Sequence, residues 1–164
     1  MPAIAALAYA TSTFTITDNF DDAENVVIGG KTYIAKGTMG AVDGHFLIES
    51  TKTLANGKLT LANLANAINL GAGSGTKYAA ETTANVLVYA TYTAGDSTLK
   101  IYSRLPGTIG NQITTTDTHG EGSWTSTVMA SGSGNLQTAL AQIESQSQLN
   151  ADLITTLSKM YAHV

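Results

Sequence analysis

The sequence predicts an α+β fold: a small antiparallel β-sheet domain with one packed helix, followed by a long C-terminal helix with the spacing of a coiled coil. Three observations lead to this prediction. Short β-branched segments separated by Gly and Asn turns fill residues 11–130. One stretch near the middle has helical periodicity. A seven-residue apolar repeat runs from Leu136 toward the C-terminus.

Alternating segments mark the expected strands. Residues 11–17 (TSTFTIT) place Phe14 and Ile16 on one face. Residues 26–35 (VVIGGKTYIA) hold two apolar runs joined by a Gly-Gly pair, which is a hairpin signal. Strand character also marks four further segments, at residues 45–49, 86–93, 98–104 and 112–117, and a closing strand at 124–129. We expect 86–93 and 98–104 to pair as a hairpin.

One helix is expected within this sheet domain, over residues 60–69. Its apolar residues recur at the i, i+3, i+4, i+7 spacing of a buried helical face: Leu61, Leu64, Ala65 and Ile68. Thr60 is placed to cap the helix and Gly71 to end it. This helix should lie across the sheet.

The C-terminal segment predicts a long helix that associates with itself. After Ser131-Gly132-Ser133-Gly134, Asn135 is placed to cap it. At 1.5 Å per residue the helix would be about 43 Å long, too long for a small domain to cover. The expected interface between copies, in a homotrimer, consists of Leu136, Leu140, Ile143, Asn150, Ile154, Leu157 and Tyr161.

A polar layer interrupts this apolar repeat at Ser147 and Asn150. Such a layer costs stability but can fix the register of a coiled coil. Two alternatives stay open: the helix folds back onto its own sheet, or it breaks near residues 146–148 into a hairpin.

The chain is thus expected to have three parts: residues 1–25, an N-terminal arm and first strand; residues 26–130, a β-rich structural module; and residues 131–164, a hinge and oligomerisation helix.

Composition excludes several classes of function. Only 12% of residues are charged and the net charge is −4, so the chain lacks the basic field that nucleic acid binding requires. No segment approaches the ~18 to 20 apolar residues of a membrane helix, so no membrane partner is expected. Cysteine is absent, which rules out disulfides, thiolate chemistry and cysteine zinc sites.

No motif indicates a catalytic, metal or cofactor site. Residues 18–25 carry four carboxylates but lack the ligand spacing and central Gly of an EF-hand, so we interpret them as a solvated acidic turn. In the Gly-rich loop 71–77, Thr76 stands between the last Gly and Lys77, unlike a phosphate-binding P-loop. The carboxylates show no spacing that suggests a hydrolase pair. We therefore expect no enzymatic activity.

Four aromatic residues could form a platform for a sugar: Tyr89, Tyr92, Tyr102 and Trp124. Rings of this kind are more often partly buried packing residues whose polar tip reaches water. Packing is therefore the favoured interpretation, and a glycan site is the alternative.

The order of phrases along the chain resembles a module that recurs in structural proteins of tailed bacteriophages. The matching runs are VVIGGKTYIAKGTMGAVDGHFLIES, LANLANAINLGAGSGTKYAAETTANVLVYAT, STLKIYSRLPGTIGNQITTTDT and GSW, between Val26 and Trp124. The chain departs from the pattern at residues 103–106, where an Ala-Lys-Thr-Ala type turn is more usual.

This resemblance implies a component of the virion that acts through contacts with other virion proteins, as a capsid decoration, head-fibre or tail-associated protein. It transfers no catalytic residue and does not decide between head, neck and tail. The alternative function is a receptor-binding adhesin that recognises host-surface glycans.

Overall fold

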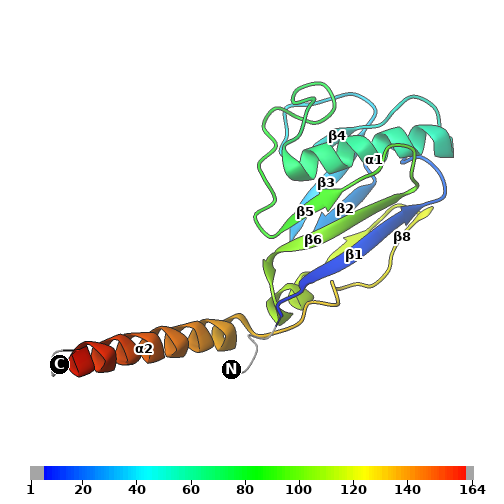
Figure 1. Ribbon diagram of the computed structural model, residues 1–164. Helices are drawn as coiled ribbons and strands as arrows, with labels where there is room; N and C mark the ends of the chain where they lie inside the picture. Colours follow the sequence, from blue (N-terminus) through cyan, green and yellow to red (C-terminus); the bar gives the residue numbers. More distant parts are fainter. Residues whose placement is uncertain (1–5, 162–164) are drawn as a thin grey trace.

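The computed structural model describes residues 6–161, with the side chains of residues 136 and 137 excepted. It shows a β-rich domain with one packed helix and a second, long helix that extends away from the domain (Figure 1). The predicted α+β class is therefore confirmed. The elements in chain order are β1 (Tyr9–Ile16), β2 (Asn25–Ile28), β3 (Lys31–Lys36), β4 (His45–Leu47), α1 (Leu54–Asn69), β5 (Val88–Thr91), β6 (Thr98–Pro106), η1 (Thr108–Gln112), β7 (Thr115–Asp117), β8 (Gly122–Trp124) and α2 (Leu136–Tyr161).

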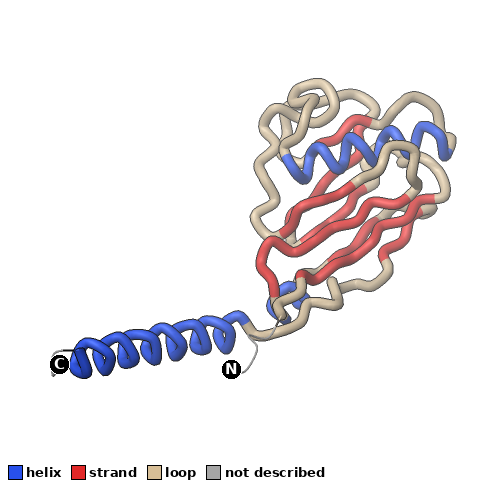
Figure 2. Tube along the Cα trace, viewed as in Figure 1, coloured by secondary structure: helices blue, strands red, loops and turns tan. Residues whose placement is uncertain are grey.

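The strands form two four-stranded sheets. The first has the order β5-β6-β1-β8, and all of its pairs are antiparallel. The second has the order β4-β3-β2-β7, with one parallel pair between β3 and β4. The inner faces of both sheets and one face of α1 share a single hydrophobic core, and the tube view shows the layers (Figure 2).

The predicted alternation holds along the strands that build this core. Phe14 and Ile16 of β1 are buried, as are Leu99 and Ile101 of β6. The register pairs Phe14 with Leu99, so these two side chains meet across neighbouring strands. The hairpins predicted at residues 26–35 and 86–104 are confirmed by the antiparallel pairs β2–β3 and β5–β6.

Gly29 and Gly30 form the turn between β2 and β3. Their φ angles are 59° and 83°, the left-handed values that a two-residue hairpin turn needs and that glycine adopts at no steric cost. A side chain at Gly29 would also stand 2.6 Å from a methyl carbon of Leu87. The Gly-Gly signal in the sequence therefore has a conformational reason and a packing reason.

The predicted start of the first helix is wrong. α1 begins at Leu54, and the hydroxyl of Thr53 accepts a hydrogen bond from the amide of Asn56 at 3.3 Å. Gly57 lies inside the helix although Gly is a poor helix former. A Cβ there would stand 2.8 Å from the carbonyl oxygen of Asp18, so glycine lets the first turns approach the end of β1 closely. Thr60 is a buried residue of α1 instead of its cap.

The end of α1 lies where the sequence places it. Leu70 has a left-handed φ of 53°, and the amide of Gly71 donates to the carbonyl oxygen of Asn66 at 2.9 Å. α1 contacts β4, β5 and β6, so it closes the side of the domain where the edges of the two sheets come together. β7 and β8 contact each other on the other side.

The closing strand predicted at residues 124–129 is replaced by a segment that changes sheets. The amide of Thr125 donates to Thr13 of β1, whereas the carbonyl oxygen of Thr127 accepts from Thr115 of β7. Because the segment bonds first to one sheet and then to the other, only Gly122–Trp124 is regular strand. β-branched composition marked the extended backbone correctly but could not show that its partner changes.

Candidate functional site

The long helix α2 is the candidate interface, because its described side chains are almost entirely exposed. From residue 138 to residue 161 only Ala139 is buried by the protein's own chain. The helix projects from the domain and does not lie on either sheet (Figure 1). It is also continuous from Leu136 to Tyr161. Neither alternative from the sequence, folding back or breaking near residues 146–148, is therefore seen.

Apart from Asn150, the predicted seam residues whose side chains are described are large, apolar and exposed. The exposed fractions of those described are Leu140 51%, Ile143 51%, Ile154 64%, Leu157 44% and Tyr161 80%. The side chain of Leu136 lies outside the described residues. In a single copy these side chains lie in water, in two groups separated by Ser147 and Asn150. Clustered apolar surface of this kind usually marks a contact with another molecule.

Two further apolar residues that the seam prediction missed widen this face. Leu153 and Met160 are 58% and 63% exposed, whereas Leu149, which is 60% exposed, lies at position c, away from the seam. With Leu140 at position a of the heptad, Leu153 and Met160 occupy position g, directly beside the seam. Continuing the heptad count to position g would have found them.

Ser147 and Asn150, the predicted polar layer, lie near the middle of α2. Asn150 is exposed, and its side-chain oxygen accepts a hydrogen bond from Nε2 of Gln146 at 3.3 Å. Ser147 is also exposed. The layer separates Leu140 and Ile143 near the domain from the apolar residues near the end of α2.

The start of α2 is held firmly against the domain. Asn135 caps the helix, since its side-chain oxygen accepts the amide of Thr138 at 3.3 Å. In the preceding Ser-Gly segment, Gly132 exchanges hydrogen bonds with the side chain of Asn111 at 2.9 and 3.0 Å. The amide of Ala8 also donates to the carbonyl oxygen of Ser133 at 3.0 Å. The segment predicted as a hinge is therefore hydrogen-bonded to two other parts of the chain.

Gly132 is required at this junction for steric reasons. A Cβ at that position would stand 2.5 Å from the carbonyl oxygen of Gly107 and 2.8 Å from Oδ1 of Asn111. The Gly and Ser residues that suggested flexibility thus serve close packing at the base of α2.

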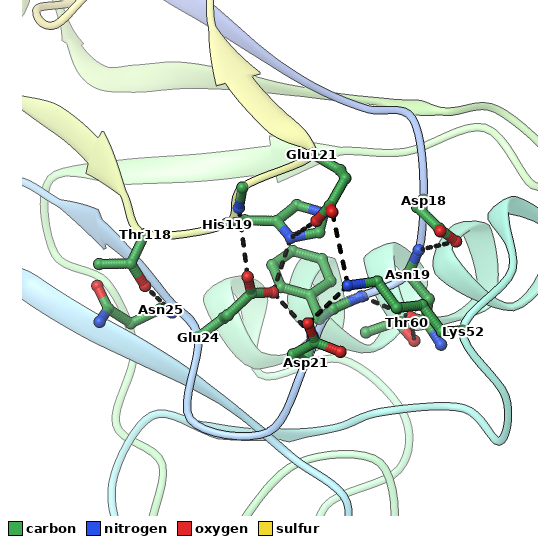
Figure 3. A network of polar contacts seen from close by, with 12 residues as sticks. Asp18, Asn19, Asp21, Glu24, Asn25, Lys52, Thr60, Thr118, His119 and Glu121 are labelled. Atoms are coloured by element: carbon green, nitrogen blue, oxygen red, sulfur yellow. Dashed lines mark hydrogen bonds and ion pairs between the residues drawn. The ribbon is translucent and has the colours of Figure 1, made fainter.

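A second cluster joins the acidic turn to the loop between β7 and β8 (Figure 3). Nδ1 of His119 lies 2.7 Å from a carboxylate oxygen of Glu24 and 3.8 Å from one of Glu121. The His119 side chain is fully buried and stacks on Phe20 with ring centroids 4.2 Å apart. Within residues 6–161 this is the group of three side chains whose atoms lie close enough together to hold a metal ion.

The hydrogen bonds of Glu24 favour a structural role for this cluster. Its carboxylate also accepts the amides of Asp21 at 2.8 Å and Gly120 at 3.2 Å. A metal ion there would have to replace the hydrogen bond between Glu24 and Nδ1 of His119. The sequence did not indicate this cluster, because Glu24 and His119 are far apart in the chain and no local motif links them.

Lys52 neutralises part of the acidic turn. Its Nζ lies 2.6 Å from the carboxylate of Asp21 and 3.5 Å from that of Glu121. The hydrogen bond from Lys52 to Asp21 raises the pKa of the lysine. The acidic turn that the sequence predicts as solvated is therefore exposed on one side. On its other side it is bonded to the loop that precedes α1.

The lysine of the Gly-rich loop also has a partner. Nζ of Lys77 forms an ion pair with Glu49, and Nδ2 of Asn63 donates to the same carboxylate at 2.9 Å. The Lys77 hydrogen bond, followed by the Asn63 hydrogen bond, lowers the pKa of Glu49. Lys77 thus ties the loop to the sheet domain.

The four aromatic residues do not converge on one platform. Tyr89 and Tyr102 stack on each other on the outer face of the first sheet, with centroids 5.2 Å apart. Trp124 instead packs against buried Phe14 on the inner face, at 5.0 Å. The hydroxyl of Tyr92 donates to the carbonyl oxygen of Lys58 at 2.6 Å. Each ring thus has a packing or hydrogen-bond partner within its own chain.

Comparison with known proteins adds no family: no protein-family model matches the chain, and no curated protein matches it. Among the residues that the structure describes, no helix is both long and apolar enough to cross a membrane.

Proposed function

We propose that the protein is a structural component of a tailed phage virion that assembles through α2, as a homotrimer. The observation that carries the assembly part is the exposed apolar face on a helix whose base is fixed to the domain. The virion part is supported by the order of phrases from Val26 to Trp124.

Isolated α2 would gain little stability by itself. Its described side chains include only three charged residues, Glu144, Asp152 and Lys159, none of them paired along the helix in an i,i+4 ion pair. Helices outside a tertiary context are marginal in water, because most helical stability comes from packing of an apolar face. Other copies of α2 that cover the row from Leu140 to Tyr161 would supply that packing.

The composition of the seam supports more than two strands. Leu140 at a and Ile143 at d follow a pattern that shifts coiled coils toward trimers and tetramers, whereas Ile154 and Leu157 follow the dimer pattern. Apolar Leu153 and Met160 at g widen the face that needs cover. A wider face fits contact with two neighbours, so we propose the trimer.

In this role the protein acts through contacts with other virion proteins, as a capsid decoration, head-fibre or tail-associated protein, and catalyses no reaction. The test is to purify, on a density gradient, the particles made from the genome that encodes the chain. Mass spectrometry should find the protein in the particle fraction, and gold-labelled antibody should mark one place on head, neck or tail. Its presence in the lysate with absence from the particles would refute the proposal.

One observation favours the adhesin as a second candidate. A hollow of about 440 Å³ lies between β7 and β8 and carries the hydroxyl, carboxylate and indole groups that bind sugars. It is lined by Thr115, Thr116, Asp117, Gly122, Ser123, Trp124, Ser126 and Thr127. Quenching or a shift of Trp124 fluorescence by a glycan that also scores on an array would support this function. A blank array with unchanged fluorescence would remove it.

A further inference from the structure

A group of large apolar side chains is exposed at the end of the domain that carries α2. Val86 is 79% exposed, Leu87 40%, Leu105 54% and Ile109 55%. We call these four residues the basal patch. They come from the chain before β5, from the end of β6 and from η1, so the fold brings them together from separate segments.

The basal patch continues into the seam of α2. One hollow is lined by Val86, Leu87, Leu105 and Ile109, among other residues. A second, larger groove of about 440 Å³ shares Leu105 and Ile109 and is closed on its other side by Leu140 of α2. No charged side chain lines either depression. Uncharged, largely apolar surface, interrupted by Thr108, Gln112 and Asn135, therefore links Val86 to Leu140 of α2.

The backbone holds these side chains in the exposed position. The amide of Arg104 donates to the carbonyl oxygen of Leu87 at 2.8 Å, and its Nε donates to that of Asn85 at 2.9 Å. Oδ1 of Asn85 accepts the amide of Leu87 at 3.0 Å. The exposure of Val86 and Leu87 is thus part of the fold, and a rigid, preorganised apolar surface binds with a small entropic cost.

η1 is fixed in the same way. A Cβ at Gly110 would stand 2.6 Å from the hydroxyl oxygen of Ser103 and 2.8 Å from Cβ of Ala10. η1 therefore lies directly on β6 and β1. Ile109, next to Gly110 in η1, lines both depressions.

We infer that the basal patch is a second self-association surface, occupied by the domain end of a neighbouring copy in a parallel assembly. The inference rests on the proposed assembly through α2 and adds the direction of the helices and a contact between domains. Leu140 belongs to both the seam and the groove, so whatever covers the seam at that level also reaches Leu105 and Ile109.

A parallel neighbour fits this surface because it brings its own Leu140 layer and its own basal patch to the same level. In a cyclic assembly each copy then uses the same surfaces, as closed symmetry requires. An antiparallel neighbour would place its domain at the far end of a helix of about 39 Å and leave both basal patches open.

Cysteine cross-linking tests this inference directly, because the natural chain contains no cysteine. Three single variants are used: Val86→Cys in the patch, Tyr161→Cys at the end of α2, and Thr91→Cys as a control on the outer face of β5. All three positions are exposed, so the substitutions remove no core contact. The reagent is a short bismaleimide, with the protein at low micromolar concentration.

We expect Val86→Cys and Tyr161→Cys to form covalent dimers about a hundredfold faster than Thr91→Cys, because neighbours held together have millimolar effective concentrations. Adding Leu157→Asp should abolish the difference. If light scattering shows a trimer while Val86→Cys reacts no faster than the control, the patch contact is refuted and the helix assembly stands. If Tyr161→Cys alone fails to react in that trimer, the parallel direction is refuted. A monomer at all concentrations would refute the proposed assembly itself.

Discussion

Leu157→Asp is the substitution that most directly tests assembly through α2. Leu157 is at position d of the seam, beyond the polar layer and far from the domain. It is 44% exposed and touches no part of the core cluster. The substitution should therefore leave the fold of the domain unchanged and act only on contacts between copies.

The magnitude follows from two contributions. Full burial of a Leu side chain is worth about 1.5–3 kcal/mol, so the 44% still exposed gives roughly 1 kcal/mol per copy and roughly 3 kcal/mol per trimer. Raising the pKa of a buried carboxyl from about 4 to about 7 costs about 4 kcal/mol, or about 12 kcal/mol for three copies. The sum is about 15 kcal/mol per trimer.

This cost translates into a large change in assembly. At about 1.4 kcal/mol per tenfold, the trimer equilibrium constant changes by about ten orders of magnitude. The concentration at half-dissociation varies as the square root of that constant, so it would increase by about five orders of magnitude. Splaying of the helix ends relieves part of the cost, and we expect an increase of at least about a thousandfold.

Size-exclusion chromatography with light scattering measures the outcome across a dilution series. The wild-type protein should elute as a trimer at micromolar concentration, and Leu157→Asp as a monomer. Ser145→Asp is the matched control, because it adds the same charge at position f, on the side of α2 opposite the seam. If Leu157→Asp and the control have the same mass as the wild type, the seam assignment is wrong.

Three further predictions concern the domain. Gly132→Ala should lower the melting temperature by several degrees through overpacking of about 1–3 kcal/mol, whereas Gly120→Ala, which meets no atom within 4 Å, should not; differential scanning calorimetry decides. Glu24→Gln should cost about 1.5–3 kcal/mol in urea unfolding with an unchanged m value, because a charged acceptor of three N–H donors is lost; stabilisation of the wild type by added Zn²⁺ would instead indicate a metal site there. Lys77 holds the pKa of Glu49 in the folded protein below its unfolded value, so this ion pair stabilises the fold at neutral pH and the stabilisation is lost as the pH falls through the folded pKa. Glu49→Gln should therefore make the melting temperature depend less on pH between about pH 6 and pH 3. An unchanged acid dependence would contradict this.

The parts of the fold that sequence could predict are those decided by local patterns. The Gly29-Gly30 turn sets the β2–β3 hairpin because both positions need left-handed backbone. Alternation around Phe14 and Ile16 identifies the buried face of β1, since side chains alternate strictly along a strand. Neither inference needs knowledge of a distant segment.

The errors occur where tertiary contacts override local preference. Gly57 argues against a helix start before Thr60, yet its missing Cβ is what lets α1 pack against Asp18. The segment after Trp124 has good strand composition, but its hydrogen-bond partners change from β1 to β7. Composition cannot report which neighbour a backbone amide meets.

The candidate site divides in the same way. The heptad positions of Leu140, Ile143 and Leu157 can be read from sequence because a helix repeats regularly, and their exposure agrees with a seam left open in the single chain. The cluster of Glu24 and His119 depends on contacts between segments far apart in the chain. The basal patch likewise forms only when the chain before β5, the end of β6 and η1 come together, so no linear motif predicts it.

The seam of α2 by itself does not determine how the copies are oriented. In coiled coils, charged pairs at e and g usually select partner and direction. The described e positions of α2 are Glu144, Ala151 and Ser158, and the described g positions are Ala139, Gln146, Leu153 and Met160. Because Glu144 is the single charged residue among them, no ion pair between e and g can form there. Only the Ser147 and Asn150 layer can select register within the helix, and because it lies near the middle of the described helix it discriminates weakly between parallel and antiparallel neighbours. In the proposed assembly, the direction would therefore come from the anchored base of α2, where Gly132 is bonded to the domain and the basal patch offers apolar surface to a parallel neighbour.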